Sequence, residues 1–193
     1  LWAYYEAGFH SLAVASVVQR FGKEGMKAAL GLLGTGQMAL TKCLILVDAD
    51  VDARDPSAVL RAVREHFDPS SDFLLLPGVP FDTLDFTSFT LNLGSKMVID
   101  ATQGGRAAAP PASLIDSAAV VRLHPRIKRA RLLEDALLAV QVDGEGRDVV
   151  QRLVQAPSLA SVKLIAAVSP DVELDDRESL LWGIFTRFDP ARD

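Results

Sequence analysis

The sequence has few of the residues that common catalytic and metal sites require. Among 193 residues there is one cysteine, Cys43, so no internal disulfide can form; its apolar neighbours predict a small core residue. The three histidines, His10, His66 and His124, lie far apart and show no metal-ligand spacing. No G-x-S-x-G elbow and no Cys/His nucleophile arrangement is present. We therefore expect neither a catalytic group nor a metal site in this chain.

Long apolar runs and an excess of positive charge are also missing. The longest apolar candidates, Leu12–Val18 and Cys43–Val47, are far shorter than the roughly 20 residues that span a bilayer. A net charge of −5 argues against a nucleic-acid partner, which would require a basic stripe. The composition, 49% hydrophobic and 23% charged, is that of a globular protein with one core or two small lobes. We expect a cytoplasmic location, where a lone thiol stays reduced.

The two ends of the sequence indicate a piece of a longer protein. It begins with Leu1 rather than methionine and has no signal-peptide pattern. It stops at Asp193, directly after an amphipathic stretch.

An internal repeat relates two parts of the chain. When residues 42–72 are aligned with residues 163–193, an offset of 121, ten of the 31 positions are identical. Each copy has the pattern of a short apolar strand, an acidic turn and a helix, which we predict at Pro56–Phe67 and Arg177–Phe188. Asp55 suits the N-cap of the first helix. The pattern predicts a duplicated strand–helix unit.

The remaining sequence predicts an α/β fold, because apolar strand patterns alternate with helical ones. We expect a mainly parallel or mixed sheet covered by helices. The predicted organisation is an α/β domain over residues 1–103, a linker over 104–125, and a smaller lobe over 126–193 that carries the second, truncated copy of the unit. Further strands are expected at Ser11–Val18, Phe73–Leu76, Lys96–Ile99 and Ala136–Val142, and further helices at Lys23–Leu33 and Arg147–Gln155.

Gly34–Ala39 satisfies the dinucleotide pattern G-x-G-x-x-A, with Asp48 further on. That fingerprint should follow a strand and open a helix. Here it follows the predicted helix Lys23–Leu33, and only Leu40–Lys42 separate it from the next strand, too few residues for a crossover helix. We therefore reject NAD binding and expect Gly34 to end the helix.

Two charged clusters allow alternative interpretations. An acidic group after the first repeat strand has oxygens that suit a hard cation, but it lacks the glycine and glutamate of an EF-hand loop, which favours an acidic turn stabilised by the helix dipole. A basic run in the second half is either a solvated face or a contact with an acidic neighbouring subunit. The acidic group is Asp48, Asp50, Asp52 and Asp55, and the basic run is Arg122, Arg126, Lys128, Arg129 and Arg131.

Lys96, in Gly94-Ser95-Lys96, is the one residue that the sequence singles out for ligand contact. The glycine leaves the backbone open, the serine supplies a hydroxyl, and the lysine supplies a point charge suited to phosphate. His10 lies where a loop enters the first long strand, and we expect it to be packed or hydrogen-bonded rather than a base.

Four runs, in order over residues 8–102, resemble those of the UbiD decarboxylases, a family that depends on prenylated FMN. Gly34–Lys42 resembles the family's Gly-x-Gly-Gln-Met … Thr-Lys run, and Gly94–Thr102 resembles Gly-Ser-Lys-Met-Gly-Ile-Asp-Ala-Thr. Gly8–Ser16 is similar to G-x-x-H-x-L-x-I-x-S. Val47–Asp55 is similar to Val-Asp-Glu-Asp-Val-Asp-Val-x-Asp, with departures at Ala49 and Ala53. The tail around Leu181–Arg187 resembles the longer forms of the family, which include those assigned to menaquinone biosynthesis.

The resemblance implies the C-terminal part of a carboxy-lyase acting on an aromatic or unsaturated acid, with quinone biosynthesis as the expected pathway. In the whole enzyme, prenylated FMN would be held with a divalent metal, usually manganese, by a central domain. The family's acid/base stretch, Glu-Gly-Pro-Phe-Gly-Glu, is absent from residues 1–193, so we expect no catalysis by this chain alone. Of the cofactor contacts, only the flavin-phosphate lysine carries over, onto Lys96.

The same resemblance implies partners. These are the protein's own N-terminal and flavin-binding domains and further copies of the chain, as a dimer or larger homo-oligomer. The C-terminal domain in this family packs subunits together and closes the active site, and such closure excludes water. We expect no cofactor to be retained by this chain alone. Two alternatives stay open: a pure oligomerisation module without ligand contact, and an independent nucleotide-binding α/β domain.

Overall fold

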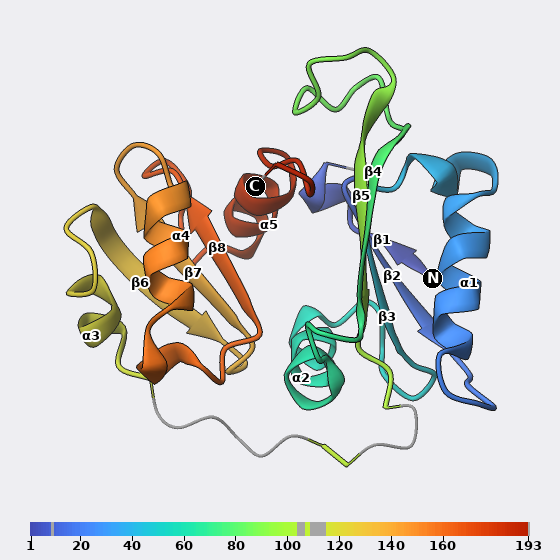
Figure 1. The fold of residues 1–193 in the computed structure, drawn as a ribbon, viewed down its shortest axis with the longest axis horizontal. Helices are drawn as coiled ribbons and strands as arrows, with labels where there is room; N and C mark the ends of the chain where they lie inside the picture. Colours follow the sequence, from blue (N-terminus) through green and yellow to red (C-terminus); the bar gives the residue numbers. More distant parts are fainter. Residues whose placement is uncertain (9, 104–106, 109–114, 193) are drawn as a thin grey trace.

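The computed structural model describes residues 1–8, 10–103, 107–108 and 115–192, which form two α/β lobes side by side (Figure 1). The first lobe contains a five-stranded sheet in the order β1-β2-β3-β5-β4, and the second a three-stranded sheet in the order β6-β7-β8. Both sheets combine parallel and antiparallel pairs. The predicted α/β class with a mixed sheet covered by helices is confirmed.

The strands are β1 (Trp2–Ala3), β2 (Leu12–Val17), β3 (Cys43–Asp48), β4 (Phe73–Pro80), β5 (Leu93–Asp100), β6 (Ile127–Leu133), β7 (Leu137–Val142) and β8 (Leu164–Val168). The α-helices are α1 (Glu24–Leu33), α2 (Pro56–His66), α3 (Ser117–Val121), α4 (Arg147–Val154) and α5 (Arg177–Phe185), and the 3-10 helices are η1 (Tyr5–Ala7), η2 (Gly36–Leu40) and η3 (Pro157–Leu159).

The five-stranded sheet has a parallel centre, β2-β3-β5, with β1 and β4 as antiparallel edges. Because successive strand residues point to opposite faces, the buried apolar runs supply two cores. On one face Leu44, Leu46 and Val98 pack against α1. On the other face Ile45, Val47 and Ile99 pack against α2 through its apolar side, which includes Val59 and Val63.

The two stretches of the predicted repeat form the same elements at the same offset. β3 is followed by α2, and β8 is followed by α5. The carboxylate of Asp55 caps α2 by accepting from the Ser57 amide at 2.9 Å, and Asp176 caps α5 by accepting from the Ser179 amide at 2.7 Å. Their surroundings differ, because β3 is central in its sheet while β8 is an edge strand. The duplication itself stays a prediction.

The two lobes share part of one core. Ala136, Leu164, Leu181 and Phe185 of the second lobe pack into the cluster formed by β2, β3 and α2. An ion pair between Arg177 of α5 and the nearly buried Glu6 of η1, at 2.8 Å, joins the lobes as well. The lobes are therefore held together by side-chain packing as well as by the connecting chain.

The structure contains two elements that the sequence did not predict, α3 and β6. The predicted linker over residues 104–125 includes a helix, α3, which packs against β6, so any linker ends before Ser117; residues 104–106 and 109–114 lie outside the described part. The basic run contains a strand, β6, which was not predicted because its charged residues interrupt the apolar pattern. Its arginines pair within the chain, as Arg129 does with Asp175 at 2.6 Å, which supports the interpretation as a solvated face.

The rejection of the dinucleotide fingerprint agrees with the structure, since Gly34–Ala39 follows α1 and leads into β3 through the short η2. Gly34 caps α1 as predicted, by donating its amide to the Leu30 carbonyl. None of the helices in the described residues is long and apolar enough to cross a bilayer.

Candidate functional site

Polar side chains gather where the central parallel strands begin, at the base of the β4–β5 hairpin. We call this group the amino-edge cluster. Its members come from the loop before β2, the start of β3, the loop after β4, the start of β5 and the segment after α5. They are His10, Lys42, Asp82, Asp85, Ser95, Lys96 and Asp189.

Lys96, the lysine predicted to touch a cofactor, lies on β5 with only 3% of its surface exposed. Its ammonium donates to the carbonyl oxygens of Ala39 at 2.6 Å and Thr41 at 3.1 Å, and so holds the end of η2 against the sheet. Burial lowers the pKa of Lys96 to about 8, although the charge of Asp82 opposes the shift. The lysine therefore organises the loop of the Gly-x-Gly-Gln-Met run.

The depressed pKa predicts how Lys96 affects stability with pH. Below about pH 8 both the folded and the unfolded chain hold the proton, and the cost of burying the ammonium is fully present. Between about 8 and the usual 10.5 only the unfolded chain holds it, so the contribution of Lys96 to stability rises with pH. We expect the free energy of unfolding, measured with urea at several pH values across this range, to rise with pH for the wild-type chain. The rise should be smaller for Lys96→Met. Parallel curves for the two proteins would contradict the shifted pKa.

Lys42 is fully buried at the entry to β3 and forms an ion pair with Asp85, with 2.7 Å between Nζ and Oδ2. It also donates to the Phe188 carbonyl at 3.1 Å and lies over the Phe81 and Phe188 rings. Burial lowers the pKa of Lys42, and Asp85 opposes that shift. This lysine ties the hairpin loop to the segment that follows α5.

His10 hydrogen-bonds to Asp82 through Nδ1, which confirms the expectation of a hydrogen-bonded histidine. Burial acts to raise the pKa of Asp82, but the Leu84 amide, His10 and Lys96 outweigh it and hold the pKa below its usual range. The pair fixes the start of the loop after β4. Ser95 Oγ donates to Asp189 at 2.5 Å and accepts from the Ala191 amide at 3.0 Å, which fastens the end of the second lobe to β5.

The acidic residues lie at the opposite edge of the sheet, where the parallel strands end. Asp48 accepts from the Gln103 amide, Asp52 from the Arg54 amide, and Asp55 caps α2. No group of three or more metal-ligating side chains occurs in the described ranges. Asp48, Asp52 and Asp55 thus hold backbone amides in turns and at a helix cap.

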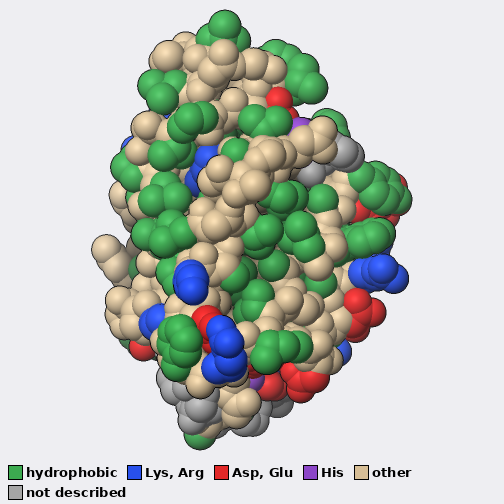
Figure 2. All heavy atoms as spheres, turned by 90° about the vertical axis from the view of Figure 1, so that its right-hand side faces the viewer, with side chains coloured by type: hydrophobic (Ala, Val, Ile, Leu, Met, Phe, Trp, Pro, Cys, Tyr) green, Lys and Arg blue, Asp and Glu red, His purple; other side chains and the backbone are tan. Residues whose placement is uncertain are grey.

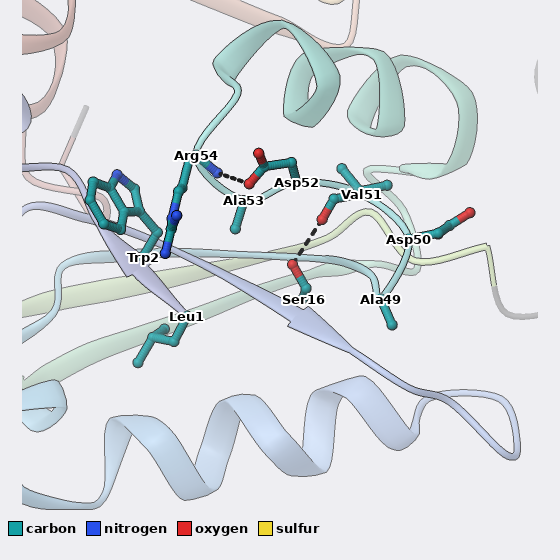
Figure 3. A pocket seen from close by; sticks show the side chains of 9 residues that line it. All are labelled: Leu1, Trp2, Ser16, Ala49, Asp50, Val51, Asp52, Ala53 and Arg54. Atoms are coloured by element: carbon teal, nitrogen blue, oxygen red, sulfur yellow. Dashed lines mark hydrogen bonds between the residues drawn. The ribbon is translucent and has the colours of Figure 1, made fainter.

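An open pocket of about 420 Å³ lies beside these turns, with the Arg54 guanidinium 5.1 Å from the centre of the Trp2 ring (Figure 3). Ser16 closes one side by donating to the Val51 carbonyl at 2.9 Å. The pocket is separate from the amino-edge cluster, because the two lie at opposite ends of the parallel strands. It contains no nucleophile–base pair.

The sequence pointed to Lys96 and His10 but not to their partners. Lys42 stood in a quoted run, Thr41-Lys42, without a role of its own. Asp82 and Asp85 lie in a loop with no periodic pattern, and Asp189 is distant in sequence. Only the fold brings these carboxylates to the two lysines.

Three of the four quoted runs, Gly8–Ser16, Gly34–Lys42 and Gly94–Thr102, thus contribute to the amino-edge cluster. Comparison with known proteins gives the family. The sequence profile of the 3-octaprenyl-4-hydroxybenzoate carboxy-lyase C-terminal domain, UbiD, matches residues 1–101 and 107–193. The chain belongs to the UbiD family. This confirms the resemblance seen in the motifs.

Two UbiD relatives align along the whole chain. An uncharacterised protein of Chlamydia trachomatis is 34% identical over 194 residues, and a protein of Chlamydia pneumoniae that is named as one subunit of a 4-hydroxybenzoate decarboxylase is 31% identical over 205. In both cases the alignment covers 100% of this chain and 32% of the relative. The chain therefore spans about a third of the length of these relatives.

Among solved structures, the vanillic acid decarboxylase of Sedimentibacter hydroxybenzoicus in its open form is similar, with 26% identity and a TM-score of 0.48. The match covers 55% of this chain and 23% of that one. At this degree of overlap the family assignment rests on the sequence profile.

Proposed function

We propose that the chain is the C-terminal part of a UbiD-type non-oxidative decarboxylase that acts on an aromatic or unsaturated carboxylic acid, with quinone biosynthesis as its pathway. The profile match along nearly the whole chain carries this proposal. The name of the Chlamydia pneumoniae relative supports an aromatic acid as substrate. In the full-length protein, prenylated FMN and a divalent metal such as manganese belong to the remaining two thirds, and this chain contributes closure and assembly.

Lys96 is the proposed contact with the flavin phosphate. Two N–H groups of its ammonium donate to the carbonyl oxygens of Ala39 and Thr41. In the described part of the chain the third N–H group has no protein acceptor. The loop that it holds, η2, contains no buried residue, so a phosphate can approach from that side. The residues present therefore fit a phosphate, with Lys96 supplying charge and the bound flavin supplying the decarboxylation chemistry.

The loop of the β4–β5 hairpin supports docking against the rest of the protein. Four large apolar side chains in this loop, Leu84, Phe86, Phe89 and Leu91, are 75–89% exposed. The hairpin projects beyond both sheets, and hydrophobic side chains appear at the corresponding end of the space-filling view (Figures 1 and 2). An exposed apolar group of this size, on a loop anchored by the buried Lys42–Asp85 ion pair and by the His10–Asp82 hydrogen bond, is suited to a protein contact. We propose that it meets the flavin-binding part on closure.

The decisive experiment measures flavin retention by the full-length protein. We expect Lys96→Met to weaken flavin binding by about 10- to 100-fold, as the loss of one charged hydrogen bond predicts. Lys27→Met, which removes the same charge from an exposed position on α1, is the matched control and should bind as the wild type does. Flavin titration monitored by absorbance and decarboxylation assays would be used. A full-length wild-type protein that neither binds flavin nor releases CO₂ from aromatic acids would refute the proposal.

A further inference from the structure

The strand β2 is longer than the strand that pairs with it on its outer side. β1 pairs antiparallel with β2 at only two positions, Trp2 with Val14 and Ala3 with Ala13. β1 is first in the strand order, so in the described part of the chain no other strand covers this side of the sheet. Residues 15–17 of β2 therefore have an open edge, although they pair with β3 on their other side.

The main-chain groups of this open stretch face outward. The Tyr4 amide donates to the Leu12 carbonyl at 3.0 Å, so the N–H and C=O groups of Leu12 face β1. These groups alternate along a strand, so those of Val14 and Ser16 face the same side. Val14 lies opposite Trp2, whereas Ser16 lies beyond the end of β1. Because open strand edges are normally covered, the main chain of Ser16 is positioned to pair with a further stretch of strand.

Two open hollows flank this edge, one on each face of the sheet. One is the pocket of about 420 Å³ beside the acidic turns, on the side of α2 (Figure 3). The other contains about 650 Å³, lies between β2 and α1, and is lined mainly by apolar side chains, which include Val17, Ala28 and Leu32. Leu1 and Ser16 line both hollows. One segment placed along the edge therefore fills both.

Under the proposed function a longer chain precedes Leu1. The matching profile is that of a C-terminal domain, and the alignments cover only 32% of the two Chlamydia relatives. The register of β1 places Leu1 opposite Ala15, so a strand continued backwards from Leu1 runs past Ser16 and then Val17. The preceding segment is covalently attached at this point, so pairing with it costs less entropy than recruiting a separate strand.

We propose that the residues directly before Leu1 extend β1 along the open half of β2, as the end of the connection from the flavin-binding part. The first of them lies opposite Ser16 and the second opposite Val17. Side chains alternate between the faces of a strand, and Leu1 lies on the α1 side of β1 while Trp2 lies on the α2 side (Figure 3). The residue opposite Ser16 therefore enters the hollow beside Trp2 and Arg54. The residue opposite Val17 enters the hollow beside α1.

The two hollows select different side chains. The one on the α2 side presents the Ser16 hydroxyl and the Arg54 guanidinium, which suit a polar side chain that accepts hydrogen bonds. The one on the α1 side is lined by Val17, Ala28 and Leu32, which suit an apolar side chain. In the full-length sequence we therefore expect an apolar residue and then a polar one before Leu1, and the reverse order would contradict the register. The connection then belongs to the first lobe, and any hinge for closure lies further upstream.

A disulfide between β2 and the preceding segment tests this register in the full-length protein. Tyr4 and Leu12 form a hydrogen-bonded pair, so by alternation the pair at Val17 is non-hydrogen-bonded, with Cα atoms about 4.5 Å apart that a disulfide can bridge. We expect Val17→Cys, combined with a cysteine at the second residue before Leu1, to give a cross-linked peptide after mild oxidation, detected by mass spectrometry. Ser16→Cys with the same partner is the matched control and should stay reduced, because its side chain points to the other face.

Hydrogen exchange of the unaltered full-length protein tests the same pairing without a variant. The Ser16 amide should exchange as slowly as the Val14 amide, which already faces β1. Fast exchange at Ser16 would overturn the proposal. Slow exchange at Ser16 without the Val17→Cys cross-link would assign the edge to another segment and overturn it as well. The proposal rests only on the part of the proposed function that places a longer chain before Leu1, so a protein that binds flavin while Ser16 exchanges rapidly would refute the strand extension alone.

Discussion

Lys42→Met is expected to destabilise the chain by about 3–5 kcal/mol, the usual cost of removing one partner of a buried ion pair. The substitution shortens the side chain by one atom and leaves the Asp85 carboxylate, which is 9% exposed, without its ammonium at 2.7 Å. The Phe188 carbonyl loses its donor at the same time. Because Lys42 links the hairpin loop to the segment after α5, both should loosen. Urea unfolding followed by circular dichroism measures the loss.

A double variant and a surface variant test whether the loss of stability comes from the unpaired, buried charge of Asp85. Lys42→Met combined with Asp85→Leu should recover much of the stability, because no unpaired charge stays buried. Arg187→Met breaks an ion pair of the same length, 2.7 Å to Asp171, whose side chains are 43% and 61% exposed, and should change stability little. If Lys42→Met lowered the free energy of unfolding as little as Arg187→Met does, water would have to reach the Lys42–Asp85 pair. That result would contradict the burial of this pair in the structure.

Gly183→Ala is expected to destabilise the chain by about 1–3 kcal/mol, the usual cost of overpacking a core. A Cβ atom at Gly183 would lie 2.5 Å from Val172 Cγ2 and 2.7 Å from Cγ1. Val172 is 2% exposed, and its β-branched side chain has little freedom to move. The helix α5, which carries Leu181 and Phe185 into the shared core, would have to shift. Thermal and urea unfolding would detect the change.

The control for this prediction is a glycine-to-alanine substitution that should stabilise the chain instead of destabilising it. Gly31 lies in α1, where nothing is within 4 Å of an added Cβ, so Gly31→Ala should stabilise by about 0.5–1 kcal/mol through helix propensity alone. Val172→Ala should partly rescue Gly183→Ala by making room. In the first repeat unit the equivalent positions are Val51 and Ala62, and Val51 is only partly buried. A stabilising Gly183→Ala would show that α5 packs less closely than the structure indicates.

Local patterns in the sequence account for most of the elements. The apolar runs of β2, β3 and β7 gave strands close to their predicted bounds, because burial on both faces leaves an unbroken signal. Asp55, the predicted N-cap, marked the start of α2, and the structure shows Asp176 in the same role at the start of α5. β6 was missed because an edge strand carries charges that interrupt the apolar pattern, and α3 was missed because it is only five residues long.

The surroundings of Lys96 show where local patterns stop being informative. The motif indicated an ammonium available to a ligand, whereas the fold places it almost fully inside, bonded to Ala39 and Thr41 across 57 and 55 residues of sequence. Its depressed pKa follows from that burial, which no local pattern records. The direct contact with a flavin phosphate stays a prediction.

By itself the sequence determined the α/β class, the order of most strands and helices, and membership of the UbiD family, because these depend on periodicity, caps and motifs that neighbouring residues carry. Only the tertiary structure decided that Lys42 meets Asp85 and Phe188, that the two lobes share a core, and that half of β2 is left with an open edge. Each of these depends on which distant segments lie side by side. Packing and burial over the whole chain decide which segments become neighbours, and no local sequence pattern records this.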